Sequence, residues 1–378
     1  MTVEQNWTQY FEGQLDDVLA ELQLYVEMET PSQDKARIDA LGEVIAARFA
    51  ALGCTVEKIP QAVQGDQLRV TYGEGEEQIL VLGHFDTVKD VGTLAVEPWR
   101  IEDGKAYGPG TYDMKSGIVF SYFALKAMIE QGVQPQKKLV FLWNTDEEIG
   151  SPSGSEPIVA EANKSALALV IEPCYGDGYL KTSRKGGGVF TVRAKGRAAH
   201  AGNEHKIGIN AIAELAHQIV TIQGWTNYEA GTTLSVGKII GGTTFNVVPE
   251  HAEMVVDVRV QTAAESERVT KLFAELKPVL PGAELHVSGE VDKFPMERTA
   301  GTERLYHHAV EQAKQEGFAL KEIGVGGVSD GNVAALAGIP ILDGLGPVGD
   351  GAHASHEHIV VNEIPRRIAL LLRLFATL

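Results

Sequence analysis

The spacing of apolar residues predicts alternating helices and strands through the first half of the chain. Apolar side chains recur every three or four residues over 14–26 and 36–51, as on one face of a helix. Three short and almost entirely apolar runs have the length of buried strands, namely 78–83, 138–143 and 168–171. Alternation of this kind predicts an α/β fold, with a mixed sheet flanked by helices.

The pattern changes near Thr182, where strands with alternating apolar and polar residues begin. Such strands are predicted at 189–194, 233–239 and 252–260, with a helix at 209–222. Alternating strands and a helix of this kind are typical of an α+β sandwich with one solvated sheet face. We therefore expect a separate domain over 182–293.

Helices and short apolar strands return after this segment, and the chain ends in a predicted amphipathic helix over 364–378. The simplest explanation is an insertion into one larger domain. We expect that domain to consist of 1–181 and 294–378, with the sandwich inserted between the two parts.

Composition narrows the function classes. The chain has 378 residues, of which 44% are hydrophobic and 22% charged, and a net charge of −18. We expect no nucleic-acid partner, because nucleic-acid binding needs clustered Lys and Arg. The first residues lack a secretory pattern and no apolar run approaches 18 residues, so we expect a cytoplasmic protein with no membrane partner. The two separated cysteines, Cys54 and Cys174, predict neither a disulfide framework nor a thiolate zinc site.

Polar residues of metal-ligand type follow each of the three apolar runs. His84 and Asp86 follow the first run, Glu147 and Glu148 the second, and Glu172 the third. Ligands of open α/β sheets bind beyond the carboxyl ends of the strands, so these residues are expected to meet in one crevice. Imidazole and carboxylate groups gathered in one place predict a site for divalent metal.

Two glycine-rich segments add further candidate ligands. Asp113 lies in the turn Gly108-Pro109-Gly110-Thr111-Tyr112-Asp113, directly before a predicted helix over 117–131, so it is either a helix cap or a ligand that bridges two cations. A second loop brings three histidines, His353, His356 and His358, of which one is needed as a ligand.

The residue types also suggest a division of roles. Adjacent glutamates at a strand end allow one to bind metal while the other acts as general base. Asp86 is placed to orient the His84 ring. Ser329 lacks the surroundings of a nucleophilic serine and is interpreted as part of a substrate-pocket loop.

Taken together, these segments resemble the M20 family of metallopeptidases, in particular its glutamate carboxypeptidase branch. The resemblance runs nearly from end to end. It covers the following segments in this order: 83–88, 108–117, 144–151, 171–173, 199–202, 246–249, 257–259 and 364–367.

The resemblance implies two zinc ions per subunit, with Co²⁺ or Mn²⁺ as possible substitutes. His84 and Glu172 would bind one ion, Glu148 and His353 the other, and Asp113 would bridge them. Glu147 would be the general base and Asp86 its catalytic neighbour. His353 is preferred to His356 because the family ligand stands four residues before a glutamate, here Glu357.

The resemblance also implies contacts made by the inserted domain. That domain would form a homodimer, and His200 would reach the partner's site to stabilise the oxyanion; a local turn histidine is the alternative. Arg259 would bind the substrate's α-carboxylate with Asn246 nearby, unless it forms a structural ion pair. Lys293 is a candidate for binding an acidic side chain of the substrate.

The expected function is hydrolysis of the amide bond before a C-terminal amino acid, with glutamate first among the candidates, in small peptides or N-acyl amino acids. One alternative is an N-acyl amino acid deacetylase of the acetylornithine or succinyl-diaminopimelate type. A non-catalytic dimeric protein that binds amino acids or peptides is an alternative from another class.

Overall fold

The computed structural model describes residues 5–378, which divide into two compact units. Unit 1 comprises the residues up to Ser183, Arg298–Gly324 and Ser329–Leu378; unit 2 comprises Arg184–Glu297 and Val325–Val328. Each unit has its own hydrophobic core. The hydrophobic pattern did not predict that the short segment Val325–Val328 belongs to unit 2, where the Lys185 amide donates to the Val325 carbonyl.

A mixed six-stranded sheet forms the centre of unit 1, in the order β1-β2-β6-β3-β7-β16. Its four strands β6, β3, β7 and β16 are parallel, and β1 and β2 are antiparallel to their neighbours. β3 is buried along its whole length, as expected for a strand apolar on both faces. The strands are β1 (Thr55–Ile59), β2 (Gln67–Tyr72), β3 (Gln78–His84), β6 (Lys138–Asn144), β7 (Ser165–Val170) and β16 (Ile341–Leu342).

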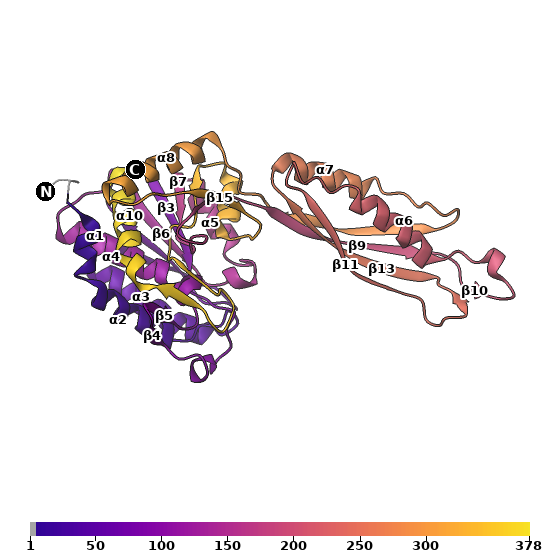
Figure 1. Ribbon diagram of the computed structural model, residues 1–378, viewed down its shortest axis with the longest axis horizontal. Coiled ribbons are helices and arrows are strands. Elements are labelled where there is room, and N and C mark those ends of the chain that lie inside the picture. Colours follow the sequence, from indigo (N-terminus) through magenta and orange to yellow (C-terminus); the bar gives the residue numbers. More distant parts are fainter. Residues whose placement is uncertain (1–4) are drawn as a thin grey trace. The chain divides into compact units, whose positions relative to one another are not determined.

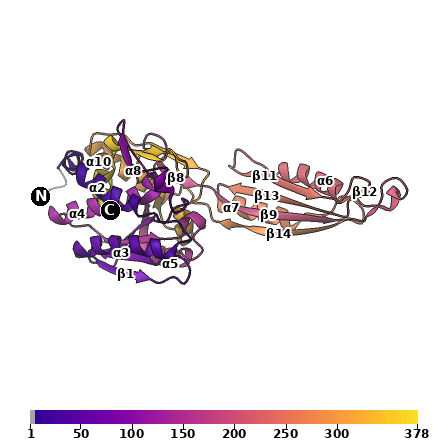
Figure 2. The same ribbon diagram turned by 90° about the horizontal axis from the view of Figure 1, so that it is seen from below.

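Helices cover both faces of this sheet (Figure 1; Figure 2). Phe141 of β6 contacts Phe49 of α3 and Phe375 of α10, so aromatic rings fill the layer between sheet and helices. The fold is therefore the mixed α/β layer that the sequence predicts. The helices are α1 (Trp7–Glu12), α2 (Leu15–Glu27), α3 (Lys35–Ala51), α4 (Ser116–Glu130), α5 (Ser155–Ala162), α8 (Ala300–Gln315), α9 (Asp330–Ala334) and α10 (Ile364–Thr377).

Helix α10 is present where the sequence predicts it, but two of its three arginines are buried. Arg367 and Arg373 are each only 2% exposed. Arg373 pairs with Glu316, and Arg367 donates to the carbonyls of Gly344 and Gly346. The arginines that make the sequence look amphipathic are thus buried and satisfied inside unit 1.

Shorter strands complete unit 1. They are β4 (Arg100–Glu102), β5 (Lys105–Tyr107), β17 (Gly349–Asp350) and β18 (His358–Val360) in one small sheet, and β8 (Leu180–Arg184) with β15 (Glu322–Val325) in another. Among residues 5–378, none of the helices is both long and apolar enough to cross a membrane.

Unit 2 is an antiparallel sheet in the order β11-β13-β9-β14, with α6 and α7 packed on one face. Buried and more exposed residues alternate along β13, and Phe190 stacks on Phe273 of α7 at 3.9 Å between ring centroids. The elements are β9 (Gly186–Lys195), β11 (Thr233–Gly241), β13 (His251–Val260), β14 (Glu284–Lys293), α6 (Ala211–Gln223), α7 (Ala263–Ala274) and the short pair β10 (Ala199–His200) and β12 (Val247–Val248).

Candidate metal centre and substrate contacts

His84 ends the buried strand β3, and its ring is oriented by Asp86. The His84 Nδ1 atom lies 3.1 Å from the Asp86 carbonyl oxygen and 3.3 Å from its carboxylate. Nε2 is buried and has no hydrogen-bond partner among residues 5–378. A buried nitrogen without a hydrogen-bond partner is costly, so this atom is placed to bind a ligand from outside the chain, such as a metal ion.

The Asp86 carboxylate also holds the loop of the two adjacent glutamates. It accepts hydrogen bonds from the backbone amides of Glu147 and Glu148, at 3.2 and 3.3 Å, and from Ser32 Oγ at 2.7 Å. Asp86 is fully buried. One carboxylate therefore sets both the His84 ring and the start of the acidic loop that follows β6.

Asp113 lies between the two histidines of the candidate site. Its Oδ1 is 3.3 Å from His84 Nε2, and its Oδ2 is 3.4 Å from His353 Nε2. The carboxylate is held by a turn in which Gly108 and Gly110 have φ of 148° and 77°, values that favour glycine. Each oxygen of Asp113 thus faces a different group of ligands.

Two groups of potential metal ligands share Asp113. The first is His84, Asp113 and Glu172, and the second is Asp113, Glu148 and His353. His84 Nε2 lies 3.4 Å from Glu172 Oε1, and His353 Nε2 lies 2.9 Å from Glu148 Oε2.

These separations fit zinc. Two ligand atoms that each lie about 2.0–2.1 Å from a tetrahedral zinc are roughly 3.3 Å apart. Three of the four separations here are 3.3 or 3.4 Å. Imidazole nitrogen and carboxylate oxygen also form a donor set that zinc prefers. The residues present therefore fit a pair of divalent ions.

The structure separates the three histidines of the C-terminal loop. His353 lies in the second ligand group, with a φ of 63° that is unfavourable for a residue other than glycine. His356 is exposed, and His358 is buried with its ring against Tyr107. The geometry thus brings His353 alone of the three to the carboxylates.

Negative charge dominates the centre. Burial raises the pKa of Glu147 well above its usual value; the charge of His84 opposes this and that of Glu172 adds to it. Burial opposes a charge on His84, but the surrounding carboxylates, Asp113 first, raise its pKa well above the usual value. Hydrogen bonds to Asp113 and Glu148 raise the pKa of His353 to about 10. Divalent cations would compensate this excess of carboxylates.

Glu147 lies beside the first ligand group but is not a member of it. Its Oε2 is 3.8 Å from His84 Nε2, and its side chain is 15% exposed. Glu147 therefore reaches solvent at the edge of the cluster, whereas His84 does not.

Sequence reasoning missed a buried polar network behind the acidic loop. Asp330 accepts hydrogen bonds from Asn144 Nδ2 at 2.8 Å and from Ser151 Oγ at 2.5 Å, and burial raises its pKa to about 6. It ties the end of β6 to the loop after Glu147. The signal in the sequence is the Ser329-Asp330-Gly331 motif, in which the aspartate stands directly beside the serine.

Ser329 is 5% exposed and caps the N-terminus of α9. Its hydroxyl donates to Asp343 at 3.0 Å and accepts from the Gly331 amide at 3.1 Å. The hydroxyl is thus engaged in local structure.

His200 and Asn246 lie side by side in unit 2. The short strands β10 and β12 pair, and the Ala201 amide donates to the Asn246 carbonyl at 3.0 Å. His200 Nδ1 accepts hydrogen bonds from the amides of Gly202 and Asn203, both at 3.1 Å. Because Nδ1 is an acceptor, the proton of the neutral ring belongs on Nε2.

Within one copy of the chain, Arg259 lies far from Asn246, which directly precedes β12 in the separate β10–β12 pair. Eight residue steps along β13 separate His251 from Arg259, or about 26 Å of extended strand. The Arg259 guanidinium pairs with Asp257 on the same face, at 3.1 and 3.0 Å. A structural ion pair therefore exists, and it also orients the guanidinium.

Lys293 lies in the same row of the sheet as Arg259. Both residues pair in register with Gly187 of β9, one from each side. A Cβ on Gly187 would approach Arg259 Cδ to 3.1 Å and Nη1 to 3.4 Å, so the absence of a side chain at Gly187 leaves room for the Arg259 side chain. The row thus carries two positive side chains on either side of a residue without a side chain.

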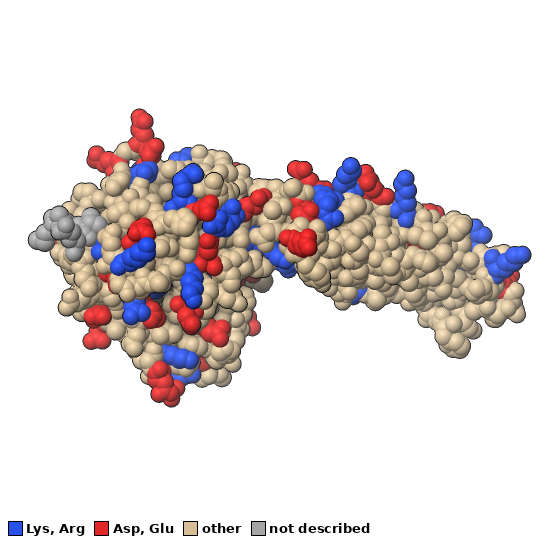
Figure 3. All heavy atoms as spheres, turned by 45° about the horizontal axis from the view of Figure 1, so that its top comes forward, with Lys and Arg blue, Asp and Glu red and all other residues tan. Residues whose placement is uncertain are grey.

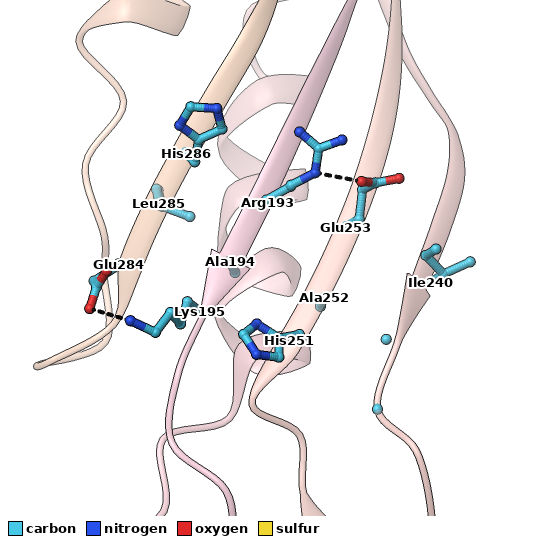
Figure 4. Close-up of a pocket in the computed structure, with 12 residues that line it drawn as sticks. Arg193, Ala194, Lys195, Ile240, His251, Ala252, Glu253, Glu284, Leu285 and His286 are labelled. Carbon is cyan, nitrogen blue, oxygen red and sulfur yellow. Dashed lines mark hydrogen bonds and ion pairs between the residues drawn. The ribbon is translucent and has the colours of Figure 1, made fainter.

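Unit 2 also has a hollow of about 760 Å³ on its open sheet face (Figure 4). Its charged groups are paired across strands, Arg193 with Glu253 at 2.7 Å and Lys195 with Glu284 at 3.1 Å. Neither of the two metal-ligand groups lies there. This hollow is therefore separate from the candidate chemistry.

Comparisons with known proteins agree with this geometry. The model of the peptidase family M20/M25/M40 matches residues 80–377, and the chain belongs to this family. The chain is 31% identical over 369 residues to carboxypeptidase G2 from Pseudomonas sp. (strain RS-16), covering 96% of this chain and 89% of that protein. It is therefore a hydrolase that acts on peptide bonds.

The chain is also similar to a desuccinylase in sequence and to an aminopeptidase in fold. A succinyl-diaminopimelate desuccinylase from Thioalkalivibrio sulfidiphilus (strain HL-EbGR7) is 27% identical over 345 residues, covering 85% of this chain and 89% of that protein. The crystal structure of aminopeptidase PepT from Bacillus cereus ATCC 10987 superimposes with a TM-score of 0.80 at 21% identity, covering 96% of this chain and 98% of that one. The latter similarity shows the fold.

Proposed function

We propose that this chain is a dizinc carboxypeptidase that removes a C-terminal amino acid, glutamate first among the candidates, from small peptides or N-acyl amino acids. The observation that carries the proposal is the pair of ligand groups that share Asp113, with Glu147 at their solvent edge. Membership of a peptidase family supports the reaction type.

The residues around the cluster suit amide hydrolysis. Bound zinc would polarise the substrate carbonyl and make water more acidic. Glu147 takes a proton on Oε2 as water adds to the carbonyl carbon, and it delivers that proton to the nitrogen as the C–N bond breaks. Its raised pKa fits a group that must both accept and release a proton. Asp86 keeps Glu147 in place through the backbone amide.

His200 suits the role of oxyanion donor. The amides of Gly202 and Asn203 occupy Nδ1, so Nε2 is left as the donor of the neutral ring. An N–H fixed in this way can stabilise the negative charge that develops on the carbonyl oxygen.

Arg259 and Lys293 support specificity for an acidic C-terminal residue. They stand on either side of Gly187 in one row of the sheet, roughly 9–10 Å apart between backbones. Arg259 would bind the α-carboxylate, and Lys293 would reach the side-chain carboxylate of glutamate. A substrate with two carboxylates matches two cations in one row of the sheet.

A homodimer through unit 2 would bring the separated residues together. Within one copy, His200 lies in the β10–β12 pair that adjoins the His251 end of the sheet, and His251 and Arg259 are already about 26 Å apart along β13, too far for one small substrate. A second copy supplies the missing residue, so we propose that His200 of one subunit serves the site of the other.

The surface of unit 2 supports this pairing. β11 is an edge strand of the sheet, and its Ile239 and Ile240 are exposed, as are Val220 of α6 and Phe245. The exposed residues of α6 between Ile212 and Gln223 include no Lys, Arg, Asp or Glu, and Figure 3 shows a broad part of unit 2 without these residue types. An apolar edge strand beside an uncharged helix face favours pairing with a second copy.

The desuccinylase relative favours a second candidate, deacylation of an N-acyl amino acid, because the same ligand groups would serve it.

A panel assay separates the carboxypeptidase from the deacylase. The zinc-loaded protein would be tested on N-acyl glutamates, dipeptides that differ in the C-terminal residue, N-acetylornithine and N-succinyl-diaminopimelate, each with a Glu147→Ala control. Release of C-terminal glutamate that the control abolishes supports the proposal. Turnover of the diamino acid derivatives alone supports the second candidate, and no turnover with two bound ions leaves only a binding role.

Complementation tests the shared site. Glu147→Ala and His200→Ala proteins are each expected to be nearly inactive. Mixed after subunit exchange, they would recover roughly a quarter of wild-type turnover, because half of the dimers are mixed and each mixed dimer has one intact site. If His200 acts within its own subunit, mixing recovers nothing.

A further inference from the structure

Glu357 is a buried carboxylate whose hydrogen bonds converge on the turn that carries Asp113. It is 4% exposed. Its Oε2 accepts from the Gly110 amide at 3.0 Å, and its Oε1 accepts from the amides of Tyr112 and Asp113 at 2.9 and 3.0 Å. Three charge-assisted bonds therefore tie this one side chain to the backbone of the turn.

The turn depends on such an acceptor. The three amides lie in the turn 110–113, where Asp113 has non-helical φ and ψ of −117° and 95°, so these amides bond to the Glu357 side chain rather than within a regular helix. Buried amides without acceptors are costly. One of the three bonds is made by the amide of Asp113 itself. Glu357 therefore fixes the backbone position from which the shared carboxylate extends toward both histidines.

Glu357 also belongs to the loop that carries His353, four residues earlier in the sequence. That loop folds tightly back on itself: a Cβ on Gly351 would lie 2.9 Å from Glu357 Cα. The Glu357 carbonyl accepts from the Gly108 amide at 3.3 Å. The loop and the turn, more than 240 residues apart in the chain, are thus joined at this one residue.

We propose that Glu357 is a positioning residue that sets the distance between Asp113 and His353 and thereby the affinity of both ligand groups for metal. The proposal rests on the proposed metal-dependent function only in that the two groups bind divalent ions. Glu357 belongs to neither ligand group. It acts through the amide of Asp113 and the loop of His353.

The test is the zinc affinity of Glu357→Gln against a matched control. In this variant an NH₂ group replaces one acceptor oxygen at nearly constant volume, so at least one amide of the turn loses its partner. Both zinc equivalents are expected to bind roughly 10–100-fold more weakly, because Asp113 belongs to both groups.

The control is Glu316→Gln, also in unit 1. Glu316 is another buried glutamate that accepts backbone amides, those of Trp7 and Thr8 at 3.4 and 2.7 Å, and it pairs with Arg373. This variant is expected to lower the melting temperature while zinc affinity, measured by chelator competition, stays at the wild-type value. A second variant, Glu357→Asp, keeps the charge and removes one methylene group, and it is expected to fold and to bind zinc with intermediate affinity.

Three outcomes overturn the proposal. They are wild-type zinc affinity in folded Glu357→Gln and Glu357→Asp proteins, a loss of affinity in the Glu316→Gln control of the same size, and a wild-type protein that binds no zinc. The last outcome removes the proposed function as well. Zinc binding that falls only in the Glu357 variants, with no hydrolysis by the wild type, supports the positioning role while the carboxypeptidase proposal fails.

Discussion

The metal-ligand groups of unit 1 and the residues of unit 2 proposed to contact substrate are built in contrasting ways. His84 is 1% exposed, and the backbone amides of its neighbours Asp113 and Glu148 donate hydrogen bonds to the carboxylates of Glu357 and Asp86. His200 and Asn246 lie exposed beside two short strands, held mainly by local hydrogen bonds. The first arrangement is buried and fixed by several elements, whereas the second is exposed and held locally.

The difference has a physical reason. Ligands of a metal must be placed to within a few tenths of an ångström, which requires buried side chains locked by packing and hydrogen bonds. Substrate contacts must admit and release a molecule, so they belong on exposed segments that can come together around it. The ligand groups of unit 1 are thus preorganised, and the residues proposed to contact substrate in unit 2 are exposed.

The largest effect is expected at the edge of the preorganised cluster. Glu147→Gln removes the proton acceptor at nearly constant volume, and turnover is expected to fall roughly 10²–10⁴-fold. Zinc stoichiometry should stay at two, because Glu147 is a member of neither ligand group. Steady-state kinetics with metal analysis on the same sample checks this. A variant that loses zinc along with activity would place Glu147 among the ligands instead.

A cavity in the core of unit 2 tests whether the two units fold independently. Phe273 stacks on Phe190 in the core of that unit, and Phe273→Ala is expected to destabilise it by about 3–5 kcal/mol. Because unit 1 has a separate core, zinc binding should survive. Denaturant unfolding followed by circular dichroism, with zinc affinity measured in parallel, tests this. A single transition that carries zinc affinity with it would show that the units do not fold independently.

A smaller effect is expected from the exposed histidine. His200→Ala removes an oxyanion donor, and kcat should fall roughly 10²–10³-fold. Its ring is exposed and bonded only within its own turn among the described residues, so melting temperature and zinc affinity should be unchanged. His200→Gln, which restores an N–H donor, should recover part of the rate. A change in stability as large as the change in rate would make His200 a structural residue.

The last expected effect is the pH dependence of metal binding, which needs no change to the chain. The pKa of His353 is raised to about 10 and that of His84 well above its usual value, so both rings carry a proton near pH 7 in the metal-free protein. Binding must displace those protons, and affinity therefore rises as pH rises. We expect about a tenfold gain per pH unit for each proton released between roughly pH 6 and 8. Calorimetry in buffers of different ionisation enthalpy counts the protons; a pH-independent affinity would contradict the assigned ligands.

Much of unit 1 could be predicted from sequence because its signals are local. Three apolar runs predicted β3, β6 and β7, and the general rule for open α/β sheets predicted that residues after them would meet. His84, Glu148 and Glu172 do lie in the two ligand groups. The helix at the C-terminus was also predicted, although its burial was not.

The features that could not be predicted from the sequence all depend on contacts between distant segments. Nothing in the sequence near Glu357 indicates that it binds the amides of a turn more than 240 residues away, or that Asp330 accepts a hydrogen bond from Asn144. Arg367 and Arg373 indicated a solvated helix face, since arginine is rarely buried, and only their partners in space explain the burial.

By itself, the sequence determined the order of helices and strands, the chemical types at the strand ends and the membership of a hydrolase family, because these depend on short-range pattern. Tertiary structure alone decided that Glu357 accepts the amides of the Asp113 turn, that Asp330 accepts from Asn144, and that Arg367 and Arg373 are buried. Such choices are set by packing between distant segments, where a shift of one residue along a strand or loop turns a side chain toward the site or away from it.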